Sequence, residues 1–165
     1  MYTSFENMPS NSRIWIYQAD REFTKSEQEQ IIDELKSFLE NWTAHQQTLK
    51  ASGKIEYNRF IIIAVDETIN LASGCSIDKQ VHFIQNLENK LQIKLLDRSL
   101  IAFKVNDQIF TVQLPKISEA VKSGQITTDT WVFNNTITTL ETLKTNWLQI
   151  ASETWLQRYF QKELV

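Results

Sequence analysis

The sequence predicts an α/β fold, bordering on α+β, with one mixed β-sheet of about five strands and helices packed on it. Short runs rich in β-branched and aromatic residues alternate with longer stretches of helical apolar spacing. A chain of 165 residues has the length of one domain, and 42% apolar with 22% charged residues is typical of a globular protein. We therefore expect residues 1–165 to form a single domain, with a polar N-terminal segment at 1–12 and a C-terminal helical segment, 138–165, packed on the core.

The first half of the chain predicts a strand, a helix and a second strand. Arg13–Gln18 alternates as a short strand, and the capping box Thr24-Lys-Ser-Glu27 begins a helix whose apolar spacing extends to about His45. Residues 51–54 interrupt the pattern. The β-branched and aromatic run Tyr57–Val65 then predicts a central, buried strand.

The second half predicts more helices and three further strands. A helix begins at residues 74–78, and a hairpin joins Leu100–Val105 to Gln108–Val112. A short helix then runs from Pro115 to near Gly124. A strand covers Thr130–Phe133, and helical segments cover 138–149 and 153–161. Because helices separate the first three strands, we expect parallel neighbours there. The element order partly matches a thioredoxin-like core.

The three glycines exclude several nucleotide-binding and hydrolase classes in their standard forms. Gly53, Gly74 and Gly124 lie too far apart for a Walker A loop, a dinucleotide fingerprint or a nucleophile elbow. The sequence therefore predicts that the chain is not a P-loop ATPase.

Cysteine and histidine are scarce. Cys75 is the single cysteine and His45 and His82 are the two histidines, which excludes an intramolecular disulfide and a four-ligand Cys/His zinc site. The longest apolar run is Phe60–Val65, residues 1–12 lack the order of a signal peptide, and the net charge is −3. We expect a cytoplasmic protein with no metal, no cofactor, no nucleic-acid partner and no membrane contact.

The candidate ligand-binding residues precede and begin the second long helix: Ser73, Gly74, Cys75, Ser76 and Asp78. A helix N-terminus offers backbone N–H groups to an anion and favours a reactive thiolate. Cys75 is thus a weak candidate nucleophile, and the alternative is a small buried residue in a turn. With parallel strands, this loop would share the carboxyl edge of the sheet with Gln18, Asp20, Arg21, Asp66 and Glu67.

His45 is a second weak catalytic candidate. It would lie beside Trp42 at the end of the first helix, where it could serve as a base. The alternative is a structural role, because a histidine at a helix C-terminus complements the helix dipole.

The C-terminal segment is unusually aromatic, with Trp147, Trp155, Tyr159 and Phe160. Trp and Tyr dominate the energetics of protein interfaces, so these residues predict a protein partner or self-association. The alternative is a helical arm that packs on the sheet of its own chain.

Several segments together resemble a small family of uncharacterised bacterial proteins that are often labelled "ABC transporter ATPase". The segments are Asn41-Trp-Thr-Ala-His45, Tyr57-Asn-Arg-Phe60, Ala64-Val-Asp-Glu67, Ala72-Ser-Gly-Cys-Ser-Ile-Asp78, Asp97-Arg98, Thr130–Asn135 and Thr138-Thr139. The resemblance covers residues 5 to 160 and implies a bacterial protein, without implying an activity. The family tends to have a Trp-His pair near its C-terminus, whereas Leu156 follows Trp155 here.

Taken together, these patterns predict a non-enzymatic binding or protein-interaction domain. The alternative is a small enzyme or ligand-binding protein that uses the Ser73–Asp78 loop with Cys75.

Overall fold

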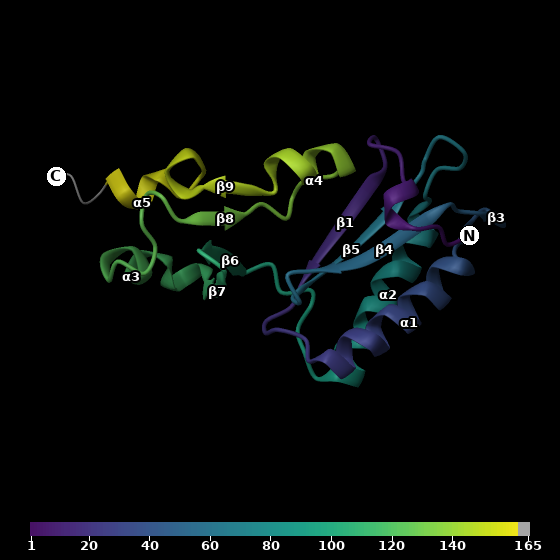
Figure 1. Cartoon of the computed structure of the whole chain (residues 1–165), viewed down its shortest axis with the longest axis horizontal. Helices are drawn as coiled ribbons and strands as arrows, with labels where there is room; N and C mark the ends of the chain where they lie inside the picture. Colours follow the sequence, from purple (N-terminus) through teal and green to yellow (C-terminus); the bar gives the residue numbers. More distant parts are fainter. Residues whose placement is uncertain (162–165) are drawn as a thin grey trace. The chain divides into compact units, whose positions relative to one another are not determined.

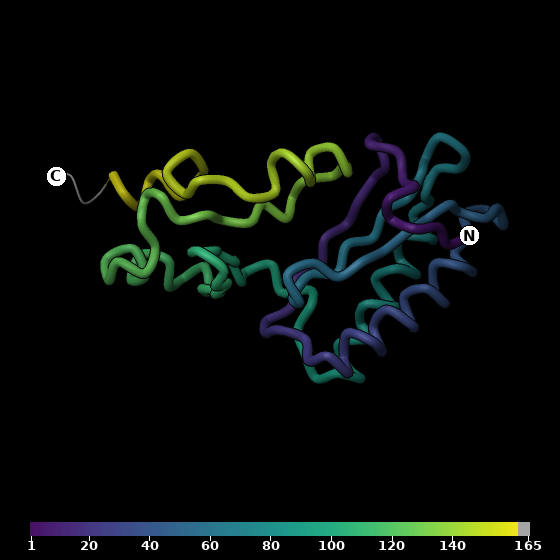
Figure 2. The backbone as a smooth tube through the Cα atoms, viewed as in Figure 1, coloured from purple at the N-terminus to yellow at the C-terminus, as the bar shows by residue number. Residues whose placement is uncertain are grey.

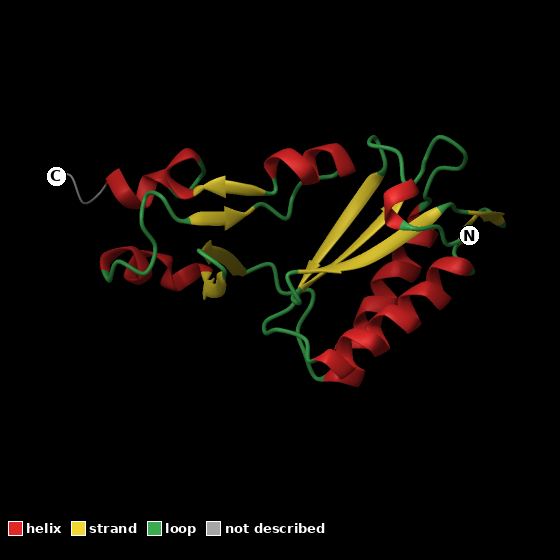
Figure 3. Cartoon of the chain, in the orientation of Figure 1, coloured by secondary structure: helices red, strands yellow, loops and turns green. Residues whose placement is uncertain are grey.

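The computed structural model describes residues 1–161. Both helices and strands occur along this part of the chain (Figure 3). The predicted α/β class is confirmed. Contacts divide the chain into two compact units: unit 1 comprises residues 1–96 and 136–144, and unit 2 comprises residues 97–135 and those from 145 onward. The single-domain organisation stays a prediction, and each unit is described in turn.

Unit 1 contains a three-stranded sheet of order β1-β5-β4, formed by Arg13–Gln18, Phe60–Val65 and Ala51–Glu56. Both ladders are antiparallel, so the expectation of parallel neighbours, and with it the thioredoxin-like order, is wrong. The cause is β4, which occupies the stretch expected to break the pattern. Tyr57 and Asn58, with φ of 53° and 54°, form the tight turn that leads straight into β5.

Helices α1 (Lys25–Glu40) and α2 (Gly74–Leu91) cover one face of this sheet (Figure 1). The predicted capping box of α1 is confirmed, with reciprocal bonds of 3.1 and 2.8 Å between Thr24 and Glu27. The helix ends earlier than expected, because residues after Glu40 form a small hairpin, β2 (Thr43–Ala44) and β3 (Gln47–Thr48).

The core of unit 1 lies between the helices and the sheet. Alternate residues of β5 point to the helices and join one apolar cluster, whose buried members include Ile31, Leu35, Leu39, Trp42, Ile61, Ile63, Val65, Ile84 and Leu87. Gly53 of β4 lies directly beneath Leu35 of α1. The absence of a side chain at Gly53 is what allows α1 to approach the sheet this closely.

Both outer edges of the unit 1 sheet are bonded at one end to other segments of the chain. The N–H of Ile14 in β1 donates to the carbonyl of Thr138 at 2.9 Å, just before α4 (Leu140–Asn146). On the other edge, the N–H of Thr3 donates to the carbonyl of Ala51 in β4 at 2.9 Å, just before the short 3₁₀ helix η1 (Phe5–Asn7). Each edge is therefore bonded to another segment at one end, at Ile14 of β1 and at Ala51 of β4.

Unit 2 contains an antiparallel sheet of order β7-β6-β8-β9, formed by Gln108–Gln113, Leu100–Val105, Trp131–Phe133 and Leu148–Ile150. Its apolar core includes residues of β6, β7 and β8 with residues of α3 (Ile117–Lys122), η3 (Ala151–Glu153) and the turn before α5 (Gln157–Gln161). The predicted β6–β7 hairpin is present. Pro115 lies in η2 (Leu114–Lys116), and α3 is followed by Gly124, whose φ is +81°.

The course of the C-terminal segment differs from the two predicted helices (Figure 2). Residues 148–150 form β9, because the N–H of Asn134 donates to the carbonyl of Trp147 at 2.7 Å and the N–H of Ala151 donates to the carbonyl of Thr130 at 2.8 Å. The spacing of Leu143, Trp147 and Ile150 fits a helix equally well, so pairing with β8 decides the conformation. The rest of the predicted segment, 162–165, lies outside the described residues.

The contact at Gly53 yields a stability prediction. A Cβ at this position would lie 2.6 Å from Cδ2 of Leu35 and 3.1 Å from Cδ1 of Leu39. We expect Gly53→Ala to lower the free energy of unfolding by about 1–3 kcal/mol, as overpacking in a core does. Urea denaturation measures this value. Gly74→Ala is the matched control, because a Cβ there meets nothing within 4 Å; equal stability of the two variants would contradict the close approach of α1.

Candidate functional site

The predicted Ser73–Asp78 loop forms the start of α2, and its serines hold that helix start together. The N–H of Ser76 donates to Oγ of Ser73 at 3.1 Å, and the N–H of Ser73 donates to Oγ of Ser76 at 2.7 Å. Oγ of Ser76 also donates to the carbonyl of Ser73 at 2.7 Å. Both hydroxyls therefore serve the helix cap, with Ser76 buried.

The other residues of this loop lie at the surface. Gly74, Cys75 and Asp78 are exposed, so the alternative that Cys75 is a small buried residue is wrong. From below, the indole N–H of the buried Trp42 donates to the carbonyl of Ser76 at 2.8 Å. The loop is thus fixed to the core at Ser76 and open to solvent at Cys75; its roles in ligand binding and catalysis stay predictions.

The antiparallel pairing separates the residues that were expected to share one edge. Gln18 of β1 pairs with Phe60, whereas Arg13 at the other end of β1 pairs with Val65. Asp20 and Arg21, which follow β1, and Asp66, which follows β5, therefore lie at opposite ends of the sheet. The expectation of a shared carboxyl edge is wrong, because it required parallel strands.

The charged residues at each end have structural partners. Arg21 donates two hydrogen bonds to the carboxylate of Glu27, at 2.7 and 2.8 Å, which lower the pKa of Glu27 to about 2. At the opposite end, hydrogen bonds from Thr68 lower the pKa of Asp66, and Lys50 lies 3.7 Å from the carboxylate of Asp66. Both carboxylates therefore stay ionised at neutral pH.

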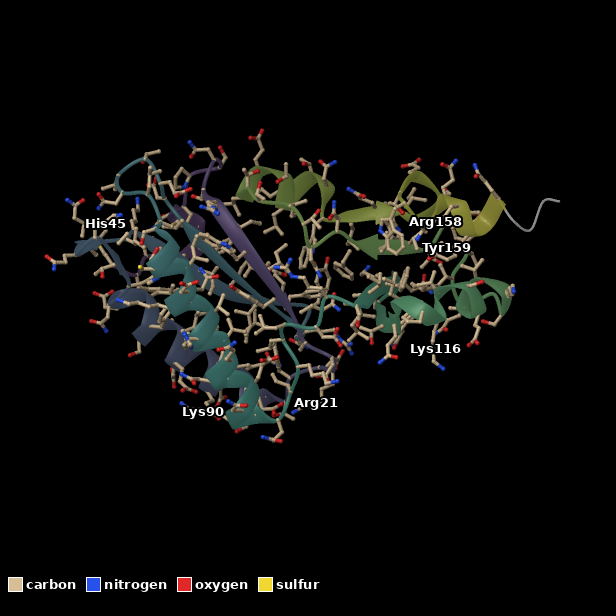
Figure 4. All side chains as sticks on the ribbon, turned by 180° about the vertical axis from the view of Figure 1, so that it is seen from behind. Arg21, His45, Lys90, Lys116, Arg158 and Tyr159 are labelled. Carbon is tan, nitrogen blue, oxygen red and sulfur yellow. The ribbon has the colours of Figure 1, made fainter. Side chains whose placement is uncertain are left out.

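His45 lies at the tip of the β2–β3 hairpin (Figure 4). Its φ of 51° places it in the turn, and its side chain is exposed, whereas Trp42 is buried with its indole bound to Ser76. The structure therefore does not combine His45 and Trp42 into one site. Within residues 1–161, no group of three or more His, Cys, Asp or Glu side chains could hold a metal ion.

A shallow groove between α1 and α2 was missed by sequence reasoning. It has a volume of about 510 Å³ and an aromatic floor in which Phe38 and Phe83 stack with ring centroids 4.7 Å apart beside Trp42. Its rim is polar, with Glu34, Ser37, Asn41 and Lys79. The aromatic floor resembles that of a binding site. On the rim, the carboxylate of Glu34 forms an ion pair with Lys90, whereas Lys79 forms no ion pair with any of residues 1–161.

The C-terminal aromatic residues divide into two groups. Trp147 is buried and its indole N–H donates to Oδ1 of Asn135 at 2.9 Å. Trp155 is 45% exposed and meets the ring of Tyr159 edge-on, with centroids 6.2 Å apart. The guanidinium of Arg158 lies 5.0 Å from the centroid of the Tyr159 ring and donates to its hydroxyl at 3.1 Å (Figure 4). We call these three side chains the Trp155 surface.

Among the helices described, none has the length and apolarity needed to span a bilayer.

The exposure of Cys75 yields a prediction about its reactivity. We expect the native thiol to react with a chromogenic disulfide reagent at a rate within about tenfold of that in urea, because access does not limit the reaction. Cys75→Ser, which should give no signal, is the control. Reaction only after denaturation would contradict the exposed position. Native reaction more than tenfold faster than in urea would favour the nucleophile interpretation.

Comparison with protein-family models, curated proteins and solved structures finds no match for this chain. The resemblance to the bacterial family therefore stays a prediction. The functional conclusion rests on the geometry of the chain's own residues.

Proposed function

We propose that this chain is a non-enzymatic protein-interaction domain that binds a protein partner through the Trp155 surface. One observation carries the proposal: Trp155 and Arg158 are exposed, and both contact Tyr159, which is half-buried against the core of unit 2. Trp, Tyr and Arg are the residue types most enriched among those that dominate binding energy in protein interfaces.

The geometry of the Trp155 surface favours binding because the side chains are ordered before a partner arrives. Arg158 contacts both rings, with its guanidinium 5.9 Å from the centroid of Trp155 and 5.0 Å from that of Tyr159. Less side-chain entropy is then lost on binding than for three independent side chains.

The chemistry of this surface also indicates the kind of partner. Arg158 forms no ion pair with any of residues 1–161. A guanidinium in this state binds a carboxylate through two parallel hydrogen bonds, and the exposed indole of Trp155 binds an apolar side chain. The partner surface should therefore present an acidic residue beside an apolar one.

The candidate catalytic residues support a non-enzymatic function. Cys75 is exposed without a neighbouring base in any hydrogen bond or ion pair of the described chain, and His45 lies in a separate hairpin turn. The hydroxyls of Ser73 and Ser76 are engaged in the helix cap. The alternative function, a small enzyme or ligand-binding protein that uses this loop, is tested by the reactivity of Cys75.

The proposal predicts a partner whose binding depends on Trp155. A photo-crosslinking residue at the exposed Gln157 should form a discrete protein adduct in the host cell, whereas the same residue at the exposed Asn58 should not form that adduct. With the purified partner, Trp155→Ala should weaken binding about 30-fold or more, as expected for a hot-spot residue.

Tyr57→Ala is the matched control, because Tyr57 is 39% exposed and lies in a turn of unit 1. The affinity of this variant should equal that of the unaltered chain. The proposal is refuted if no adduct forms at position 157, or if Trp155→Ala and Tyr57→Ala weaken binding equally.

A further inference from the structure

The outer edge of β9 differs from the edges of the unit 1 sheet. Trp147 and Ala151 bond to Asn134 and Thr130, the residues that flank β8, and Gln149 between them pairs with Val132. In an antiparallel ladder bonded residues alternate, so the N–H and C=O groups of Leu148 and Ile150 point away from β8. No other segment of residues 1–161 bonds to them, whereas residues near Thr138 bond to β1 at Ile14 and residues 1–3 bond to β4 at Ala51.

The edge of β9 also lacks the side chains that discourage strand pairing. Its sequence, Leu148-Gln-Ile150, contains no charge and no proline, and its register with β8 is unbroken. A second strand can therefore approach this edge without burying a charge.

An exposed aromatic side chain lies beside the same edge. Trp131 of β8 is 42% exposed and pairs directly with Ile150, so the indole lies on the sheet face that carries Ile150 and Leu148. These three residues line a groove of about 330 Å³, whose other walls are Thr145, Asn146, Gln149 and Glu153. The groove is mostly polar, and it places the side chains of Trp131, Leu148 and Ile150 next to unpaired backbone groups. Strand addition uses backbone hydrogen bonds together with such side-chain contacts.

We infer that β9 pairs antiparallel with β9 of a second copy of this chain about a two-fold axis, which joins two four-stranded sheets into one. Gln149 lies on the axis opposite its own symmetry mate. Leu148 lies opposite Ile150 of the partner subunit, and each such pair exchanges two backbone hydrogen bonds. The Trp131 indole of each copy then covers the leucine–isoleucine pair next to it.

Self-complementarity supports a second copy of the chain as the occupant of this edge. A two-fold pairing places each residue of one edge against the same edge of the other copy. Here it opposes leucine to isoleucine and a neutral amide to the same amide, so no like charges meet. The inference is independent of the proposed function, because it involves β9 and Trp131 rather than the Trp155 surface.

Sedimentation equilibrium of the full chain tests the inference. We expect a species of twice the 19.3 kDa chain mass at micromolar concentration, and we expect Ile150→Glu to raise the dissociation constant at least tenfold. Ile109→Glu is the matched control: Ile109 is a half-buried isoleucine on β7, the opposite outer strand of the same sheet. A monomeric chain at 100 μM (about a hundred times a micromolar constant), or equal weakening by both variants, would overturn the inference.

Hydrogen exchange gives a second measurement that does not depend on a variant. The amide protons of Leu148 and Ile150 should become more protected as protein concentration rises, while those of Ile109 and Thr111 on the β7 edge should not change. Absence of this difference would refute pairing at β9. Trp155→Ala should leave the dimer intact; dissociation by that variant would assign self-association to the Trp155 surface and overturn pairing at β9.

Discussion

The backbone hydrogen bond from Ile14 to Thr138, with those from Leu140 to Ser12 and from Glu141 to Ser10, holds a late segment of the chain in unit 1. It attaches residues 136–144 to the outer edge of β1 in unit 1, after the chain has already formed β6, β7 and β8 in unit 2. The chain then returns to unit 2 to form β9. Neither unit is a continuous stretch of sequence, so each is completed by residues that follow part of the other.

This interleaving has an energetic consequence for unit 1. If unit 2 unfolded while Thr138 stayed paired with Ile14, residues 97–135 would form a closed, disordered loop. Closing a loop of that length costs on the order of 3 kcal/mol, a large part of the net stability of a typical domain. If unit 1 unfolded instead while unit 2 stayed folded, only residues 136–144 would form a loop between the two parts of unit 2. Closing that shorter loop costs less free energy. Unit 1 therefore depends on unit 2 more than unit 2 depends on unit 1.

Local signals in the sequence predicted local structure well, and features set by distant contacts were not predictable. The capping box at Thr24 and Glu27 and the end of α3 just before Gly124 each depend on a few neighbouring residues. By contrast, β4 forms because β5 pairs with it, with Gly53 lying beneath Leu35, and β9 forms because β8 pairs with it. The start of α2 was predicted, but the groove beside it was not, because Phe38 and Phe83 stack across two helices and each alone has the spacing of a core residue.

Native-state hydrogen exchange in rising urea tests the dependence of unit 1 on unit 2 most directly. The amide proton of Ile14 reports the bond to Thr138, and that of Phe103 reports the sheet of unit 2. We expect Ile14 to lose protection at the same urea concentration as Phe103 or at a lower one. Protection of Ile14 that persists at urea concentrations where Phe103 exchanges freely would contradict this account.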